Sequence, residues 1–150
     1  MAAVSYPEKN VVDFVSANLI PIQVASDAEP LASDFLVSWT PLLILLDADG
    51  KEHCRSMGFL PPEELVPYLM LGIAKIHFDR DDLVKAIQVF DSLLVKYPRS
   101  IAAPEALFLC GVSLFKDRKD PGRLKETYED LKERYPDSDW VVRSSPYRLL

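Results

Sequence analysis

Two cysteines and two histidines are the residues of this sequence best suited to redox or metal chemistry. Cys54 and Cys110 lie 56 residues apart, so they form neither a C-x-x-C redox pair nor a spacing typical of metal ligands. His53 directly precedes Cys54, but neighbours on a strand point to opposite faces, so adjacency does not make them a pair. We expect both thiols to be buried, structural cysteines. A redox sensor based on Cys54 is the alternative.

His77 is followed by a short run of acids, which raises the question of a metal site. The acids are Asp79, Asp81 and Asp82. A solvated loop that caps the following helix explains them more simply, because a carboxylate at a helix start accepts hydrogen bonds from free backbone amides. No Ser-His-Asp set, glycine-rich phosphate loop or paired-carboxylate motif is visible in the sequence. We therefore predict no catalytic residues, no metal and no cofactor.

The charge is distributed unevenly along the 150 residues, which carry a net charge of −6. Residues 1–78 hold 4 basic and 10 acidic side chains, whereas residues 79–150 hold 13 of each. Because no basic surface is available to release phosphate counterions, the sequence argues against a nucleic-acid partner. No apolar stretch reaches the roughly 20 residues that span a bilayer, and no signal peptide is visible. The sequence predicts a soluble, cytoplasmic protein without a membrane partner.

The first third of the chain alternates short helix-like and strand-like segments. Apolar residues at helical spacing follow Pro7, and residues 30–37 predict a second, short helix. The β-branched run at residues 19–24 favours a strand, and Pro21 within it suggests an edge or a strand start.

A hairpin is predicted next. Residues 42–46 are apolar without alternation, which is typical of a strand covered on both faces. A tight turn at residues 47–50 and a partner strand at residues 51–59 complete it.

From residue 62 onward the apolar spacing predicts four helices, and the last two helical hairpins form an internal repeat. Residues 86–100 align with residues 124–138 at a shift of 38, and both copies end in Lys/Arg-Tyr-Pro-x-Ser. In this ending the tyrosine packs at the helix end, the proline stops the helix and the serine can cap the next one. A period in the high thirties is typical of helical hairpins that stack to bury their faces.

These repeats, at about residues 63–136, resemble the tetratricopeptide repeat family. The matching residues are Gly72, Ala86, Phe90, Leu93 and Pro98 in the first unit and Gly111, Tyr128 and Pro136 in the second. The tryptophan of the family's first helix is absent, and the period is about four residues longer than the usual unit. The spacing is closer to the looser repeats of bacterial assembly and lipoprotein-trafficking factors.

A second resemblance involves residues 39–71. These residues hold Trp39-Thr40-Pro41, an apolar strand, an Asp-Ala-Asp-Gly turn, a second strand and a helix, in that order. This order resembles the C-terminal half of the thioredoxin fold, and residues 4–26 resemble the helix and strand before it. The resemblance implies a peptide-binding edge at Trp39, Thr40 and Pro41, with Pro41 a cis proline. A trans proline at a strand start is the alternative.

The two resemblances together imply the fold class and the domains. The fold class is α/β, an incomplete thioredoxin-like layer, followed by all-α helical hairpin repeats. The domains are a truncated thioredoxin-like domain at residues 1–75 and tetratricopeptide-like helical repeats at residues 63–150, which share one helix.

The redox pair and the central strand of a thioredoxin are missing from this sequence. Either they lie upstream of Met1, or the protein lacks them and has become a binding scaffold. In both cases residues 19–25 and 42–48 flank an open position, so we expect their edges to pair with each other or with another chain, for example in a homo-oligomer. The favoured function is a non-catalytic module that binds a protein or peptide. The alternative is the C-terminal part of a thiol-disulfide oxidoreductase.

Overall fold

The computed structural model describes all 150 residues, which divide into two compact units. The first unit comprises Met1–Val66 and the second comprises Pro67–Leu150. Helix α3, Pro62–Asp79, crosses the boundary, and its first turn carries Glu63 and Glu64, where acids suit the helix dipole. No helix combines the length and the apolar character needed to cross a membrane.

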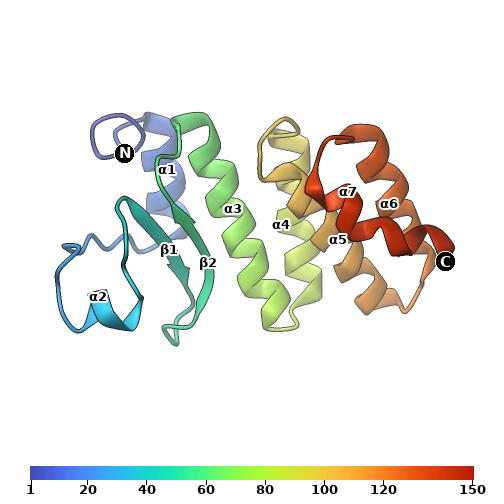
Figure 1. Cartoon of the computed structure of the whole chain (residues 1–150), viewed down its shortest axis with the longest axis horizontal. Helices are drawn as coiled ribbons and strands as arrows, with labels where there is room; N and C mark the ends of the chain where they lie inside the picture. Colours follow the sequence, from blue (N-terminus) through green and yellow to red (C-terminus); the bar gives the residue numbers. More distant parts are fainter. The chain divides into compact units, whose positions relative to one another are not determined.

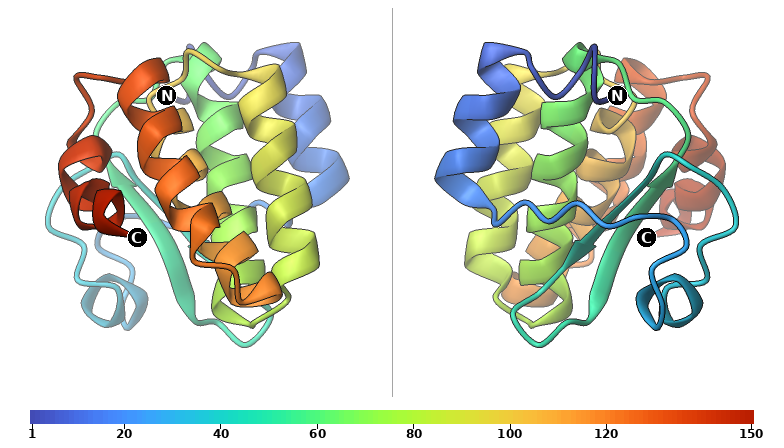
Figure 2. Two further views of the ribbon diagram at one scale, coloured as in Figure 1. Left: turned by 90° about the vertical axis from the view of Figure 1, so that its right-hand side faces the viewer. Right: turned by 90° about the vertical axis from the view of Figure 1, so that its left-hand side faces the viewer.

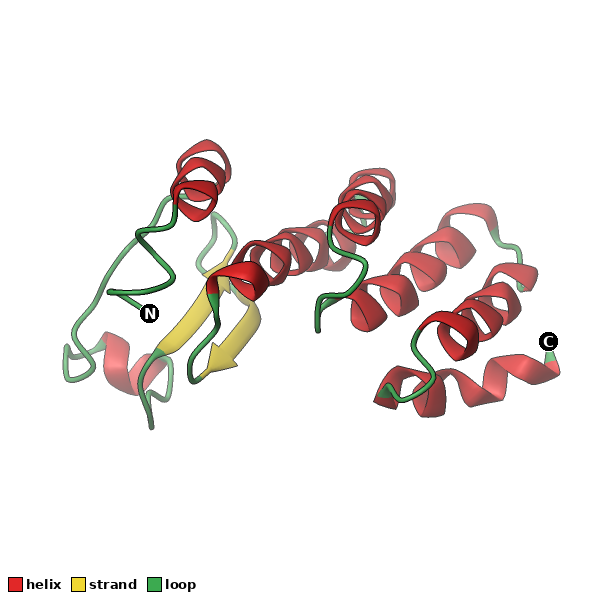
Figure 3. Ribbon diagram, turned by 90° about the horizontal axis from the view of Figure 1, so that it is seen from above, coloured by secondary structure: helices red, strands yellow, loops and turns green.

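The first unit contains two short helices and a two-stranded antiparallel sheet (Figure 3). Its elements are α1 Lys9–Asn18, α2 Leu31–Asp34, β1 Leu42–Leu46 and β2 Glu52–Met57. The hairpin turn forms because the Asp47 carboxylate accepts hydrogen bonds from the backbone N–H groups of Asp49 and Lys51, both at 3.0 Å. Gly50 completes the turn at a φ of 80°, a conformation that a side chain would disfavour. The predicted helices, hairpin and turn are thus confirmed.

The predicted strand at residues 19–24 is wrong. The chain has no regular structure there, and the side chains of Ile20 and Ile22 are 90% and 81% exposed. A strand needs a neighbour to satisfy its backbone groups, and β1 pairs only with β2. Pairing of this segment with residues 42–48 within the chain is therefore also wrong.

The strand β1 is less covered than its apolar sequence predicts. Of its five residues only Leu45 is buried, and Leu46 is 39% exposed. Complete cover requires a packed layer on each face of a sheet, which two strands and two short helices do not supply. The apolar run therefore predicts the strand correctly and its burial on both faces wrongly.

The second unit is a stack of helical hairpins (Figure 1). After the Pro67–Asp79 part of α3, its elements are α4 Leu83–Lys96, α5 Ala103–Arg118, α6 Gly122–Arg134, α7 Asp139–Ser144 and the 3-10 helix η1 Ser145–Leu149. Helix α5 packs against both α4 and α6, and the α7–η1 segment lies along α6 (Figure 2). Phe90, Leu93 and Leu131 have no exposed surface and form the centre of this core.

Gly111 allows α5 and α6 to approach closely. A Cβ atom at this position would lie 1.8 Å from Oγ1 of Thr127 on α6, which no real contact tolerates. The glycine that matches the repeat family is thus required by the packing of one helix against the next.

The two Lys/Arg-Tyr-Pro-x-Ser turns are built alike. Ser100 Oγ accepts a hydrogen bond from the backbone N–H of Ala102, and Ser138 Oγ accepts one from Trp140. The turns are also joined, because the Tyr135 hydroxyl donates to the Pro98 carbonyl oxygen at 2.8 Å. The predicted repeat is therefore a repeat of geometry as well as of sequence.

Candidate functional site

The segment Trp39-Thr40-Pro41 lies between α2 and β1 in the first unit. Trp39 is 68% exposed, and no hydrogen bond joins the backbone of Thr40 to the rest of the chain. The Thr40–Pro41 peptide bond is cis, and the Pro41 carbonyl accepts a hydrogen bond from Gly58 N–H at 2.8 Å. An exposed indole beside a free stretch of backbone is a feature of surfaces that bind extended peptides.

A buried hydrogen bond between a histidine and a carboxylate in the hairpin was not foreseen from the sequence. His53 Nε2 lies 2.9 Å from Asp47 Oδ2, and the two side chains are 0% and 6% exposed. The hydrogen bond with His53 is the main cause that lowers the pKa of Asp47, and the backbone N–H groups of Lys51 and Asp49 lower it further. The pair fastens the turn to β2. The signal was present, because a six-residue separation around an Asp-x-x-Gly turn brings both side chains together.

Both cysteines are buried and free, as predicted, and they lie in different units. Burial, together with the nearby Asp91 carboxylate, raises the pKa of Cys110 to about 12. Its thiol therefore stays protonated at neutral pH and is a poor nucleophile. Cys54 is only 7% exposed on β2.

Two of the acids after His77, Asp81 and Asp82, form ion pairs around the loop between α3 and α4. Asp82 occupies the N-cap position of α4 and pairs with Lys85 at 2.9 Å, and His77 Nδ1 lies 3.5 Å from Asp82 Oδ2. The hydrogen bond from Lys116 lowers the pKa of Asp81. No group of three or more His, Cys, Asp or Glu side chains is arranged to hold a metal ion.

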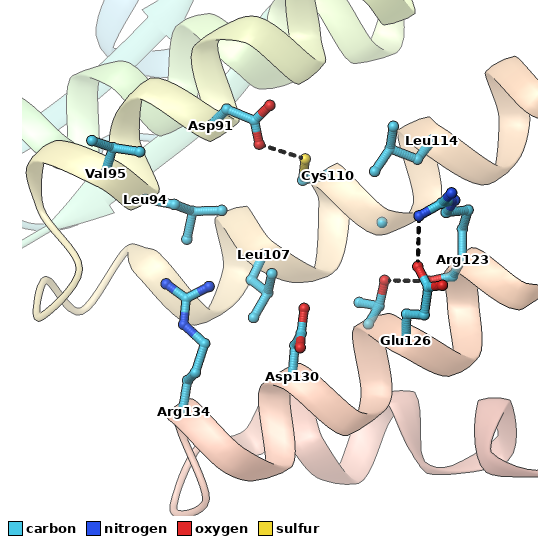
Figure 4. Close-up of a pocket in the computed structure, with 12 residues that line it drawn as sticks. Asp91, Leu94, Val95, Leu107, Cys110, Leu114, Arg123, Glu126, Asp130 and Arg134 are labelled. Carbon is cyan, nitrogen blue, oxygen red and sulfur yellow. Dashed lines mark hydrogen bonds and ion pairs between the residues drawn. The ribbon is translucent and has the colours of Figure 1, made fainter.

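A groove of about 520 Å³ lies between α4, α5 and α6 in the second unit (Figure 4). Leu94, Leu107 and Leu114 give it an apolar lining. Along α6, the lining residues recur at spacings of three and four, so they occupy one face of that helix. They are Arg123, Glu126, Thr127, Asp130 and Arg134.

The charged groups of the groove differ in how they are satisfied. Arg123 Nη1 lies 2.7 Å from Glu126 Oε2, so these two charges neutralise each other. Asp91 Oδ1 accepts a hydrogen bond from the Cys110 thiol at 3.5 Å. The Arg134 guanidinium stacks on the ring of Tyr135, 5.4 Å from its centroid. The Asp91 and Asp130 carboxylates have no cationic partner in the structure.

A second hollow, of about 380 Å³, lies where the two Tyr-Pro-x-Ser turns meet. It is lined by Arg99, Arg134 and Tyr135 together with prolines and the two capping serines. Both serine hydroxyls already accept hydrogen bonds from the backbone.

The groove itself could not be found from the sequence, because it depends on how three helices diverge in space. The repeat period does not supply the pair of Asp91 and Asp130 either, because a shift of 38 aligns Asp91 with Glu129, and Asp130 is one residue, about 100°, further around its helix.

Comparison with known proteins supports the repeats. A tetratricopeptide repeat family model matches residues 68–100 and 105–138. The first match covers most of α3 together with α4, and the second covers most of α5 together with α6. No curated protein matches the chain. No solved structure matches it either. The helical-repeat prediction is thus confirmed for residues 68–138, while the thioredoxin-like part stays a prediction.

Proposed function

We propose that this chain is a non-catalytic module that binds a segment of a partner protein in the groove between α4, α5 and α6. Tetratricopeptide repeats indicate a protein–protein interaction module, and residues 68–138 match them. The observation that carries the proposal is the groove, about 520 Å³ with an apolar lining and charged walls. Its size is within the range of ligand pockets, which runs from about 300 to 1,000 Å³.

The groove lies on tightly packed helices. Its floor belongs to α5, which has residues Ala106 and Cys110 buried and is fixed against α6 by the close approach at Gly111. Partner segments bind with less loss of entropy to a surface that is already ordered. A floor of packed helices therefore favours binding without rearrangement.

A second candidate surface is the Trp39-Thr40-Pro41 edge of the first unit. We propose that this unit is an incomplete thioredoxin-like layer and that the free backbone of Thr40 pairs with an extended peptide, with Trp39 against its side chains. Such pairing obtains affinity from main-chain hydrogen bonds. The exposed Ile20 and Ile22 and the outer edge of β1 offer the same opportunity to a second copy of the chain.

The experiment that tests the proposal is selection of peptides from an unbiased display library on the full chain. Bound peptides are then measured against matched variants. Val95→Trp places a bulky side chain on the groove wall, whereas Val84→Trp makes the same change on α4 outside the groove. Both valines are exposed, at 80% and 58%, so neither change should disturb folding.

We expect Val95→Trp to weaken peptide binding at least about tenfold and Val84→Trp to leave it unchanged. If Trp39→Ala weakens peptide binding and Val95→Trp does not, the binding site is the edge of the first unit. Selection of no peptide at all would contradict a binding function. A non-catalytic chain should also reduce no insulin disulfide, and turnover in that assay would overturn this part of the proposal.

A further inference from the structure

Asp91 and Asp130 lie on opposite walls of the groove. Asp91 belongs to α4 and Asp130 to α6, and Figure 4 shows both carboxylates beside the apolar floor. Asp91 Oδ1 accepts a hydrogen bond from the Cys110 thiol, which leaves Oδ2 free. Asp130 has no hydrogen bond or ion pair within the chain. The groove thus presents two unneutralised negative charges.

The two arginines of the groove form no ion pair with Asp91 or Asp130. Arg123 forms ion pairs with Glu126 at 2.7 Å and with Asp120 at 3.5 Å, so two carboxylates already balance its charge, although its buried Nε atom has no hydrogen-bond partner. Arg134 follows Asp130 by one turn of α6 and stacks on Tyr135. The region between Asp91 and Asp130 is therefore negative, whereas the end of the groove near Arg134 is positive.

Charge complementarity then specifies the occupant. A cation next to an apolar surface interacts more strongly with a carboxylate than it does in bulk water, because the local dielectric constant is lower. Lysine and arginine also carry aliphatic stems that cover apolar surface while the charged end reaches a polar group. Val95, which is 80% exposed, and the half-buried Leu114 offer such a surface in the same groove, whereas Leu94 and Leu107 are buried beneath it.

We propose that the groove selects a partner segment that places a lysine or arginine between Asp91 and Asp130, with apolar side chains against Val95 and Leu114 beside it. This inference rests on the proposed binding function and names the chemical class of the partner. Acidic and uncharged segments lack the group that the two carboxylates require.

The test uses short labelled peptides of about ten residues, with two leucines that flank a central position occupied by Lys, Gln or Glu. Their binding to the full chain is measured by fluorescence anisotropy. The variants are Asp91→Asn and Asp130→Asn, which remove one charge each and keep an acceptor oxygen for neighbouring donors. Glu129→Gln is the matched control, because it removes the same charge from α6 at a residue outside the groove.

We expect the Lys peptide to bind best and each Asp→Asn variant to weaken it about threefold, which is the range of a partly exposed ion pair. Glu129→Gln should leave its affinity unchanged, and Arg134→Gln should strengthen it about twofold by removing a repelling charge. Higher salt should reduce the preference for Lys over Gln. Circular dichroism of each variant confirms that folding is intact.

The outcomes separate the two proposals. Equal binding of Lys, Gln and Glu peptides overturns the inference and leaves a binding groove of another specificity. A Lys preference that Glu129→Gln weakens as much as Asp130→Asn also overturns it, because the net charge then explains the effect. Failure of every peptide, including those from the unbiased library, overturns the binding function itself.

Discussion

The two units of this chain bury their apolar side chains to very different degrees. Most of the exposed large apolar residues lie in the first unit, whereas most of the buried ones lie in the second. Helical hairpins close their backbone hydrogen bonds locally and bury one face against the next hairpin. Strands need partners that are distant in sequence. The contrast shows that a helical repeat buries its own apolar faces, while a strand-poor layer leaves apolar surface exposed.

The largest expected effect on stability comes from comparing the same substitution, phenylalanine to alanine, in the two units. Phe90→Ala removes a ring with no exposed surface in the second unit and should cost about 3–5 kcal/mol of unfolding free energy. Phe59→Ala removes a ring that is 55% exposed in the first unit and should cost less than about 1 kcal/mol. Urea denaturation followed by circular dichroism measures both. Similar losses would mean that the first unit is packed as well as the second.

The next effect concerns the close approach of α5 and α6. Gly111→Ala brings a Cβ atom against Thr127 and should cost about 1–3 kcal/mol, since the helices must separate. Thr127→Ala removes Oγ1 and Cγ2, at 1.8 and 2.8 Å, but leaves Cβ at 2.7 Å, so it relieves part of the clash and the double variant should lose less than the sum of the single losses. Thermal unfolding measures all three variants. Additive losses would show that the contact does not limit the packing.

A smaller effect distinguishes the two copies of the turn. Tyr135→Phe removes the hydrogen bond to Pro98 and should cost about 0.5–1.5 kcal/mol. Tyr97→Phe is the matched change in the first copy, where the hydroxyl makes no hydrogen bond, and it should be nearly neutral. Chemical denaturation of both variants measures the two losses in unfolding free energy. Equal costs would mean that the inter-turn hydrogen bond contributes nothing to stability.

The smallest effect is confined to acid and belongs to the first unit. The pKa of Asp47 is lowered, so its contribution to stability is present above the ordinary value of 3.8 and is lost as the pH falls through the lowered value. Asp47→Asn should therefore flatten the fall in stability of the wild type below about pH 4. Unfolding measured from pH 6 to pH 2 checks this. An unchanged acid dependence would show that other carboxylates cause it.

The sequence was most informative where local rules suffice. The helix ends at Tyr97 and Tyr135 follow from prolines that stop helices, and the turn after β1 follows from Gly50. The segment at residues 19–24 has the composition of a strand but lacks a neighbour, and composition carries no information on that. The groove beside Asp91 depends on distances between three separate helices, so local patterns missed it, whereas the hydrogen bond between Asp47 and His53 follows from the local geometry of one hairpin and was overlooked.

The hydrogen bond from Tyr135 to Pro98 has a consequence for how such an array can grow. The donor belongs to the turn of one hairpin and the acceptor to the turn of the preceding hairpin. A tandem duplication of one hairpin therefore supplies both groups at once: the new copy carries the tyrosine donor, and the turn of the original copy carries the carbonyl acceptor. The hydrogen bond that links two successive hairpins is therefore duplicated together with the hairpin, and no further mutation is needed to form it.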